Sequence, residues 1–245
     1  MNKLNFQDLR FCVLRIPKNV RTIMQDKQWS NQMFIAGGFI RSVITNEKIN
    51  DIDIFVSTVE KAELLAYKLC KDKKDIIKTD NAYTVRGNPC LQIIHRWVFN
   101  NAKDITNSFD FTICAAAIYC DVVGDNKFTY DSFCHQLFYQ DLAAKRLTYM
   151  QPQRNEDAGG SMLRVLKYYQ KGYRIPLDSL GMVIARLTKA FDASKIDLKN
   201  EFETSKIITG LLRQVDPNVD PTREAHLPSS QTPTEEIDFS EIQFD

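Results

Sequence analysis

The sequence predicts an α+β protein, in which a mixed sheet with helices on one face is followed by a small helical domain. In the first half, short apolar runs are bounded by glycine, asparagine and proline, the pattern of strands. In the second half, apolar residues recur at helical spacing. From Asp216 onward, proline, serine, threonine and acidic residues replace most apolar ones. We therefore expect a head at residues 1–131, a helical neck-like domain at 132–214 and a disordered acidic tail at 215–245.

The composition is that of an ordinary globular chain, with 44% hydrophobic and 26% charged residues among 245. No apolar run is long enough to cross a bilayer, and the first ten residues lack the apolar core of a signal peptide. The six cysteines include no Cys-x-x-Cys pair, and the three histidines are widely spread. These observations predict a cytoplasmic protein with reduced, buried thiols and no zinc site.

The charge is unevenly distributed along the chain. Residues 215–245 hold eight acidic residues and one basic residue, and residues 1–214 hold 31 basic and 23 acidic residues, a net charge of +8. A basic body suits a phosphate-bearing substrate, although many proteins that bind no nucleic acid carry a similar surplus.

The local pattern of the head predicts alternating strands and helices. We expect strands at residues 33–36, 51–56, 84–86 and 91–98, and helices at 39–44, 57–73 and 102–108, followed by a long apolar run at 109–120. Ser57 is the expected N-cap of the second helix, with Glu60 completing a capping box. Farther along the chain we expect helices at 134–146, 160–171, 179–190 and 200–212, with Gly172 as a helix stop.

Asp51 and Asp53 are the strongest candidates for chemistry. They stand two residues apart on a predicted strand, so their side chains point to the same face, with Cα atoms about 7 Å apart. Carboxylates so placed can share two magnesium ions, which clamp the oxygens of a phosphoryl transfer. The alternative is a surface strand with two solvated acids.

A paired-glycine turn precedes the acids. Gly37 and Gly38 join a strand to a helix, where backbone N–H groups can approach a triphosphate closely, and Arg41 one turn later can bind phosphate oxygens. The alternative is a tight turn with a solvated arginine.

Together, Gly37-Gly38-Phe39-Ile40-Arg41 and Asp51-Ile52-Asp53 resemble the first motif of CCA-adding enzymes and bacterial poly(A) polymerases, within the polymerase-β nucleotidyltransferase superfamily. The run from Asp110 to Ala115 resembles the second motif of that family, and Met162-Leu163-Arg164 resembles its neck helix. The resemblance spans residues 33–174 with gaps, and it implies a polymerase-β-like palm followed by a neck.

The resemblance also implies roles for individual residues. Asp51 and Asp53 would bind Mg²⁺ or Mn²⁺ and activate an acceptor hydroxyl, and the residues Gly37, Gly38 and Arg41 would hold the triphosphate of a nucleoside triphosphate. Asp110 would act at the catalytic centre by contacting the sugar or supplementing the metal site. Arg164 would face the incoming nucleotide.

Three departures from the family pattern bear on activity. Ser108 and Phe109 replace an arginine pair, Gln92 stands where a third carboxylate is expected, and Ser161 stands near the position of a base-reading arginine, although Glu156-Asp157 is kept. The main interpretation is an enzyme that moves a nucleotide to a hydroxyl acceptor, for which an RNA 3′ end, a small molecule, a protein hydroxyl and RNA held by a partner stay open. The alternative is a catalytically impaired nucleotide- or RNA-binding module.

Isolated aromatic and tail residues have simpler interpretations. We expect His95 to be a structural histidine, and we favour packing over base stacking for the tyrosines Tyr168, Tyr169 and Tyr173. Apolar residues recur in the acidic stretch 236–245, which suggests docking on a partner protein or an electrostatic plug over a basic cleft.

Overall fold

The computed structural model describes residues 2–70, 72–122, 127–152, 158–189 and 199–215. These residues divide into two compact units, each described by itself: the first holds residues 2–109 and 113–142, and the second holds 110–112 together with the described residues from 143 to 215. The acidic stretch 216–245 and the pair Glu156-Asp157 lie outside the described residues.

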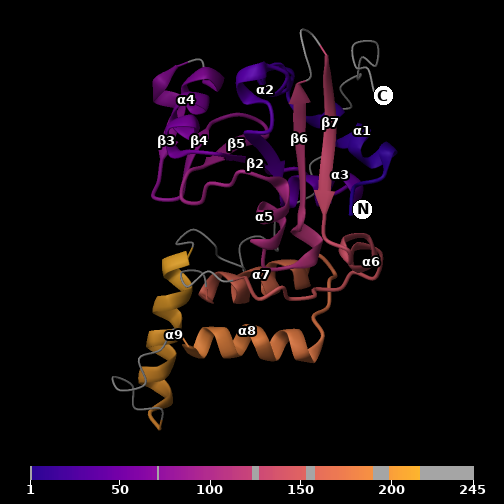
Figure 1. Cartoon of the computed structure of the whole chain (residues 1–245). Coiled ribbons are helices and arrows are strands. Elements are labelled where there is room, and N and C mark those ends of the chain that lie inside the picture. Colours follow the sequence, from indigo (N-terminus) through magenta and orange to yellow (C-terminus); the bar gives the residue numbers. More distant parts are fainter. Residues whose placement is uncertain (1, 71, 123–126, 153–157, 190–198, 216–245) are drawn as a thin grey trace. The chain divides into compact units, whose positions relative to one another are not determined.

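The first unit is built on a seven-stranded mixed sheet with the strand order β3-β4-β5-β2-β1-β6-β7 (Figure 1). Only β2 and β5 pair in parallel, and the other neighbours are antiparallel. The strands are β1 Met33–Ala36, β2 Asp51–Val56, β3 Ile76–Lys78, β4 Ala82–Val85, β5 Cys90–Ile94, β6 Ala116–Val122 and β7 Phe128–Cys134.

Helices cover both faces of this sheet. The helices and 3-10 turns of this unit are α1 Phe6–Arg15, α2 Lys18–Met24, η1 Lys27–Trp29, α3 Gly38–Ile44, α4 Val59–Leu69, η2 Lys73–Asp75, α5 Ala102–Asn107, η3 Thr112–Cys114 and α6 Phe138–Ala143. Ile52 and Ile54 are fully buried on the face where α3 and α4 pack against β2. On the opposite face α5 inserts Ala102 and Ile105 into a cluster with Phe55.

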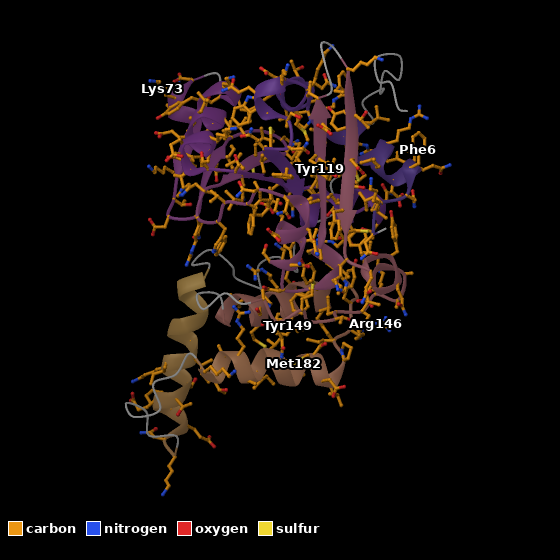
Figure 2. All side chains as sticks on the ribbon, viewed as in Figure 1. Phe6, Lys73, Tyr119, Arg146, Tyr149 and Met182 are labelled. Carbon is orange, nitrogen blue, oxygen red and sulfur yellow. The ribbon has the colours of Figure 1, made fainter. Side chains whose placement is uncertain are left out.

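The second unit is helical. Its helices are α7 Ala158–Gln170, α8 Leu177–Lys189 and α9 Glu201–Val215, and α7 contacts both of the others (Figure 1). Tyr149, labelled in Figure 2, packs its ring 5.7 Å from that of Phe111 and helps to fix the segment 110–112 to this unit. The α+β fold class, with a mixed sheet followed by helices, is therefore confirmed. The expectation that helices cover one face of the sheet is wrong, because α5 packs against Phe55 on the second face.

Most predicted elements are found within a few residues, and three predictions are wrong. The N-cap of α4 is Thr58, whose Oγ1 accepts a hydrogen bond from the Lys61 N–H at 3.3 Å, while Ser57 bonds Gln32 instead. The helix ends at Leu69, where Cys70 turns extended, and does not reach residue 73. The predicted helix at 134–146 is also wrong in its first turn, because that segment begins with the last residue of β7, and α6 spans only Phe138–Ala143.

Several smaller predictions are confirmed. Gly172 follows α7 with a φ of +85°, as a helix stop requires. His95 lies 2.9 Å from the Thr79 carbonyl and against the Tyr83 ring, a structural role. Tyr168 and Tyr173 are buried as expected. Tyr169 is different, because 55% of it is exposed, with the Arg174 guanidinium over its ring.

Candidate active site

The acid pair lies on the partly open face of the sheet. Asp51 and Asp53 are half-buried, whereas Ile52 and Ile54 between and after them are fully buried. This alternation directs both carboxylates to the face that also carries Phe55. β2 is held on both sides, antiparallel to β1 and parallel to β5, so the two acids stand on a rigid central strand.

The glycine turn lies beside the second acid. Gly37 has φ +83° and ψ −136°, a conformation that residues with a side chain rarely adopt, and its N–H donates to the Ala116 carbonyl at 3.1 Å. A Cβ placed on Gly37 would lie 3.6 Å from Asp53 Oδ2. The same Cβ would lie 3.0 and 3.1 Å from two ring carbons of Phe109. The turn, one acid and one aromatic ring therefore meet within van der Waals range.

Arg41 lies next to the turn but is already engaged. Its guanidinium nitrogens would be 3.7 and 3.9 Å from a Cβ on Gly38. The side chain is only 5% exposed, with Nε 3.6 Å from a Glu47 carboxylate oxygen and Nη1 3.4 Å from Cys114 Sγ. The buried guanidinium thus anchors α3, and direct contact with a phosphate would require it to exchange these partners.

Gln92 and Cys90 stand beside the acids on β5. The parallel register pairs Asp53 with Gln92 and Asp51 with Cys90, so all four side chains share one face. Burial, together with the negative charges of Asp51 and then Asp53, raises the pKa of the Cys90 thiol. An amide therefore occupies the place beside Asp53 where a third carboxylate was expected.

Phe109 fills the position of one of the expected arginines. Its ring stands edge-on to that of Phe55, with centroids 6.0 Å apart and an interplanar angle of 84°. The preceding Ser108 donates its hydroxyl hydrogen to the Ile105 carbonyl at 2.6 Å, which closes the end of α5. Here the aromatic pair forms an apolar wall beside the glycine turn, in place of cationic contacts.

Asp110 and Arg164 are brought together, within the second unit. Asp110 is 7% exposed and accepts hydrogen bonds from the Arg164 guanidinium and, at 3.0 Å, from the Ser161 hydroxyl. Its carbonyl also accepts from the Met150 N–H at 2.8 Å. The two residues predicted to contact a nucleotide therefore form an ion pair with each other, and Ser161 adds a contact where an arginine was expected.

The acid pair has the donor chemistry of a magnesium site. Mg²⁺ is commonly held in proteins by one or two carboxylates and completes its octahedron with water and substrate phosphate oxygens. In the described part of the chain, no group of three or more histidine, cysteine, aspartate or glutamate side chains is arranged to hold a metal ion. Asp51 and Asp53 therefore fit a site with two carboxylates, in which water and the substrate supply the remaining oxygens.

Sequence reasoning missed two neighbours of the acids. Cys90 stands just before the predicted strand at 91–98, and no local pattern indicates that it pairs with Asp51. At Phe109 the sequence indicates only the replacement of an arginine, and it does not predict the proximity of the ring to Gly37. Cys90 precedes Gln92 by two residues, and residues two apart on a strand share one face of the sheet. That spacing could have indicated that Cys90 lies beside the acids.

The fold defines the class to which this chain is similar. A CCA-adding enzyme in complex with CTP superposes with a TM-score of 0.55 at 15% identity, covering 91% of this chain and 52% of that one. The Thermotoga maritima CCA-adding enzyme complexed with tRNA gives a TM-score of 0.50 at 16% identity, covering 77% and 46%. At such identities the likeness shows a nucleotidyltransferase-like fold, and this chain spans about half the length of these enzymes.

Sequence comparison places the chain more specifically. A family model described as Gabija anti-defense 2 family protein matches residues 14–145. The protein named Gabija anti-defense 2 from Bacillus phage SPbetaL7 is 30% identical over 151 residues, which cover 59% of this chain and 34% of that protein. The chain belongs to the Gabija anti-defense 2 family. It spans about a third of the length of that phage relative.

Proposed function

We propose that this chain is a metal-dependent nucleotidyltransferase that moves a nucleotide from a nucleoside triphosphate to a hydroxyl acceptor. The observation that carries the proposal is the position of Asp53, whose Oδ2 lies 3.6 Å from the Cβ site of Gly37, on the same sheet face as Asp51. An acid pair beside a two-glycine turn offers carboxylates for a cation and, at Gly38, a backbone without a side chain for the phosphates that the cation carries.

Each residue of the site would have a separate role. Asp51 and Asp53 would hold Mg²⁺ or Mn²⁺, which supplies charge neutralisation at the phosphates when bound. The glycine turn Gly37-Gly38 would hold the triphosphate, with room for it at Gly38, and Arg41 would bind a phosphate by exchanging its contact with Glu47. The acceptor oxygen would bond to the α-phosphorus as the bond to pyrophosphate breaks, with the hydroxyl proton released to solvent.

The wider role follows from the family. Its description names an action against the Gabija defence, and we extend that role to this chain, with nucleotide transfer as the means. Asp110 and Arg164 form an ion pair with each other, which by itself accounts for their positions. Their contacts with a nucleotide therefore stay predictions.

Isosteric replacement of the acids tests the enzyme. The full chain is incubated with each α-labelled nucleoside triphosphate, Mg²⁺ or Mn²⁺ and total RNA, and transfer is measured together with pyrophosphate release. Asp51→Asn and Asp53→Asn should each lower transfer by at least about a hundredfold, because each removes a metal-binding charge. Asp104→Asn, on the exposed face of α5, is the matched control and should leave transfer unchanged. Equal transfer by all three variants would refute the assignment.

A second candidate function is a nucleotide- or RNA-binding module with little catalysis. It is favoured by Gln92, because an amide beside Asp53 can neither accept the acceptor proton nor bind a cation as a carboxylate does. This candidate predicts nucleotide binding that is measurable by calorimetry with no turnover under any metal or acceptor condition. Turnover that depends on Asp51 would exclude it.

A further inference from the structure

The cationic side chains expected around the acid pair either contact other residues or are replaced. Arg41 is buried against Glu47 and Cys114. Ser108 and Phe109 occupy the expected arginine pair. A substrate with several phosphates still requires positive charge beside the acids, on the side away from the glycine turn.

The sheet register points to one arginine on that side. Asp51 pairs with Cys90 on β5, and the antiparallel pairing of β5 with β4, in which Val85 faces Leu91, places Arg86 opposite Cys90. Arg86 is the first residue after β4, and its N–H donates to the Asp75 carbonyl at 3.1 Å, so the hydrogen bonding of β4 toward its β3 side extends one residue past the strand. Alternation along the strand then places the Arg86 side chain on the face of Thr84, Gln92 and the acids.

The distances suit a shared anionic substrate. Neighbouring strands lie about 4.8 Å apart, so the Cα of Arg86 stands about 10 Å from that of Asp51, and a guanidinium reaches about 6 to 7 Å from its own Cα. Arg86 is exposed and forms no ion pair with the other residues that the structure describes. Half-buried polar side chains of Thr84 and Gln92 lie along the same face.

Arg86 and the glycine turn lie on opposite sides of the acid pair. Gly37 follows β1, which flanks β2 on one side, and Arg86 follows β4, which lies beyond β5 on the other side. If the triphosphate lies at the glycine turn, the acceptor enters from the side of Arg86. We propose that Arg86 binds a phosphate group of the acceptor, so that the acceptor class is a hydroxyl compound that carries a phosphate near its reacting oxygen. This inference rests on the proposed function.

Two sources share this chemistry, the 3′ end of a nucleic-acid strand and a free nucleotide. The test measures binding of a 5′-fluorescein-labelled decauridylate to the full chain by fluorescence anisotropy between 50 and 200 mM KCl, without nucleoside triphosphate. Arg86→Gln should weaken binding about tenfold and reduce the slope of log affinity against log salt by about 0.7, the value of one phosphate contact on a single strand. Arg86→Lys keeps the charge and should restore most of the slope.

Lys78→Gln is the matched control. Lys78 is an exposed cation at the same sheet edge, but it alternates to the opposite face, with its Nζ 5.1 Å above the Tyr83 ring. This variant should keep the wild-type slope. An unchanged slope for Arg86→Gln, or an equal loss for Lys78→Gln, would overturn the proposal.

Competition separates the two sources. If adenosine monophosphate displaces the oligonucleotide from the wild type, and displaces it less well from Arg86→Gln, the acceptor is a free nucleotide. Oligonucleotide binding that depends on Arg86 but resists the mononucleotide identifies a strand end. If neither ligand binds in a manner that depends on Arg86, the proposal is wrong. Asp51→Asn is assayed for transfer separately, so a failure of catalysis and a failure of acceptor binding appear in different measurements.

Discussion

Replacement of Gly37 by alanine tests the geometry of the turn directly. The backbone at φ +83° and ψ −136° costs a residue with a side chain about 1 to 3 kcal/mol. The new Cβ would also lie 3.0 and 3.1 Å from Phe109 ring carbons, well inside the optimal contact of about 3.5 to 4.0 Å. Because Phe55 packs edge-on against that ring, the ring cannot move freely. We expect Gly37→Ala to lower the free energy of unfolding by about 3 kcal/mol.

Urea unfolding followed by tryptophan fluorescence is the appropriate assay. Both tryptophans of the chain, Trp29 and Trp97, belong to the first unit and report on it alone. In a Gly37→Ala, Phe109→Ala double variant, the loss of unfolding free energy should be about 1 kcal/mol smaller than the sum of the two single losses. Truncation of the ring removes the steric clash with the new Cβ but leaves the cost of the backbone conformation.

The neighbouring glycine provides the control. A Cβ on Gly38 would meet only Arg41 nitrogens at 3.7 and 3.9 Å, ordinary contacts, so Gly38→Ala should change stability by less than about 0.5 kcal/mol. A loss below about 1 kcal/mol for Gly37→Ala, or additive effects in the double variant, would refute the reasoning.

Three further outcomes are expected. Gln92→Glu should tighten Mn²⁺ binding about tenfold in calorimetry by adding a third carboxylate, and unchanged affinity would mean that the side chain does not face the metal. Asp110→Asn should lower the free energy of unfolding of the helical unit, measured by urea unfolding with circular dichroism, by about 2 kcal/mol, because Arg164 loses its charged partner. An unchanged free energy of unfolding would contradict this. Burial, and then the charge of Asp8, raises the pKa of Cys12 to about 12 from 9.0, so the thiol stabilises the fold below pH 9 and this contribution is lost as the pH rises toward 12. Cys12→Ala should flatten that alkaline fall in a series of melting temperatures, and an equally steep fall would count against the assignment.

Local sequence signals predicted the centre of the sheet well. β1 at Met33–Ala36 and β2 at Asp51–Val56 have the predicted bounds, because each is a short apolar or alternating run that ends at a turn signal. The same reasoning failed at residues 134–146. There apolar residues fit both periods, and pairing with β6 decides the conformation of Cys134. Such pairing is non-local and leaves no mark in a short window.

In the candidate site too, local features could be predicted from the sequence and non-local contacts could not. The shared face of Asp51 and Asp53 follows from alternation alone, and so does the proximity of Gln92 once β5 is known to pair in parallel with β2. The state of Arg41 could not be predicted, because its burial depends on Cys114, which lies 73 residues away in sequence. The ion pair of Asp110 with Arg164 spans 54 residues and depends in the same way on tertiary structure.

The short segment 110–112 has a practical consequence for anyone who dissects this protein. Its backbone is held by the helical unit, through the Thr112 N–H on the Thr148 carbonyl and the Met150 N–H on the Asp110 carbonyl, although the sheet-bearing unit precedes and follows it in the chain. A fragment that stops at residue 142 would retain this tripeptide but lose every one of those hydrogen-bond partners, and it would also leave the Asp110 carboxylate without Arg164. Expression of the sheet alone therefore calls for replacement of these three residues by a polar linker.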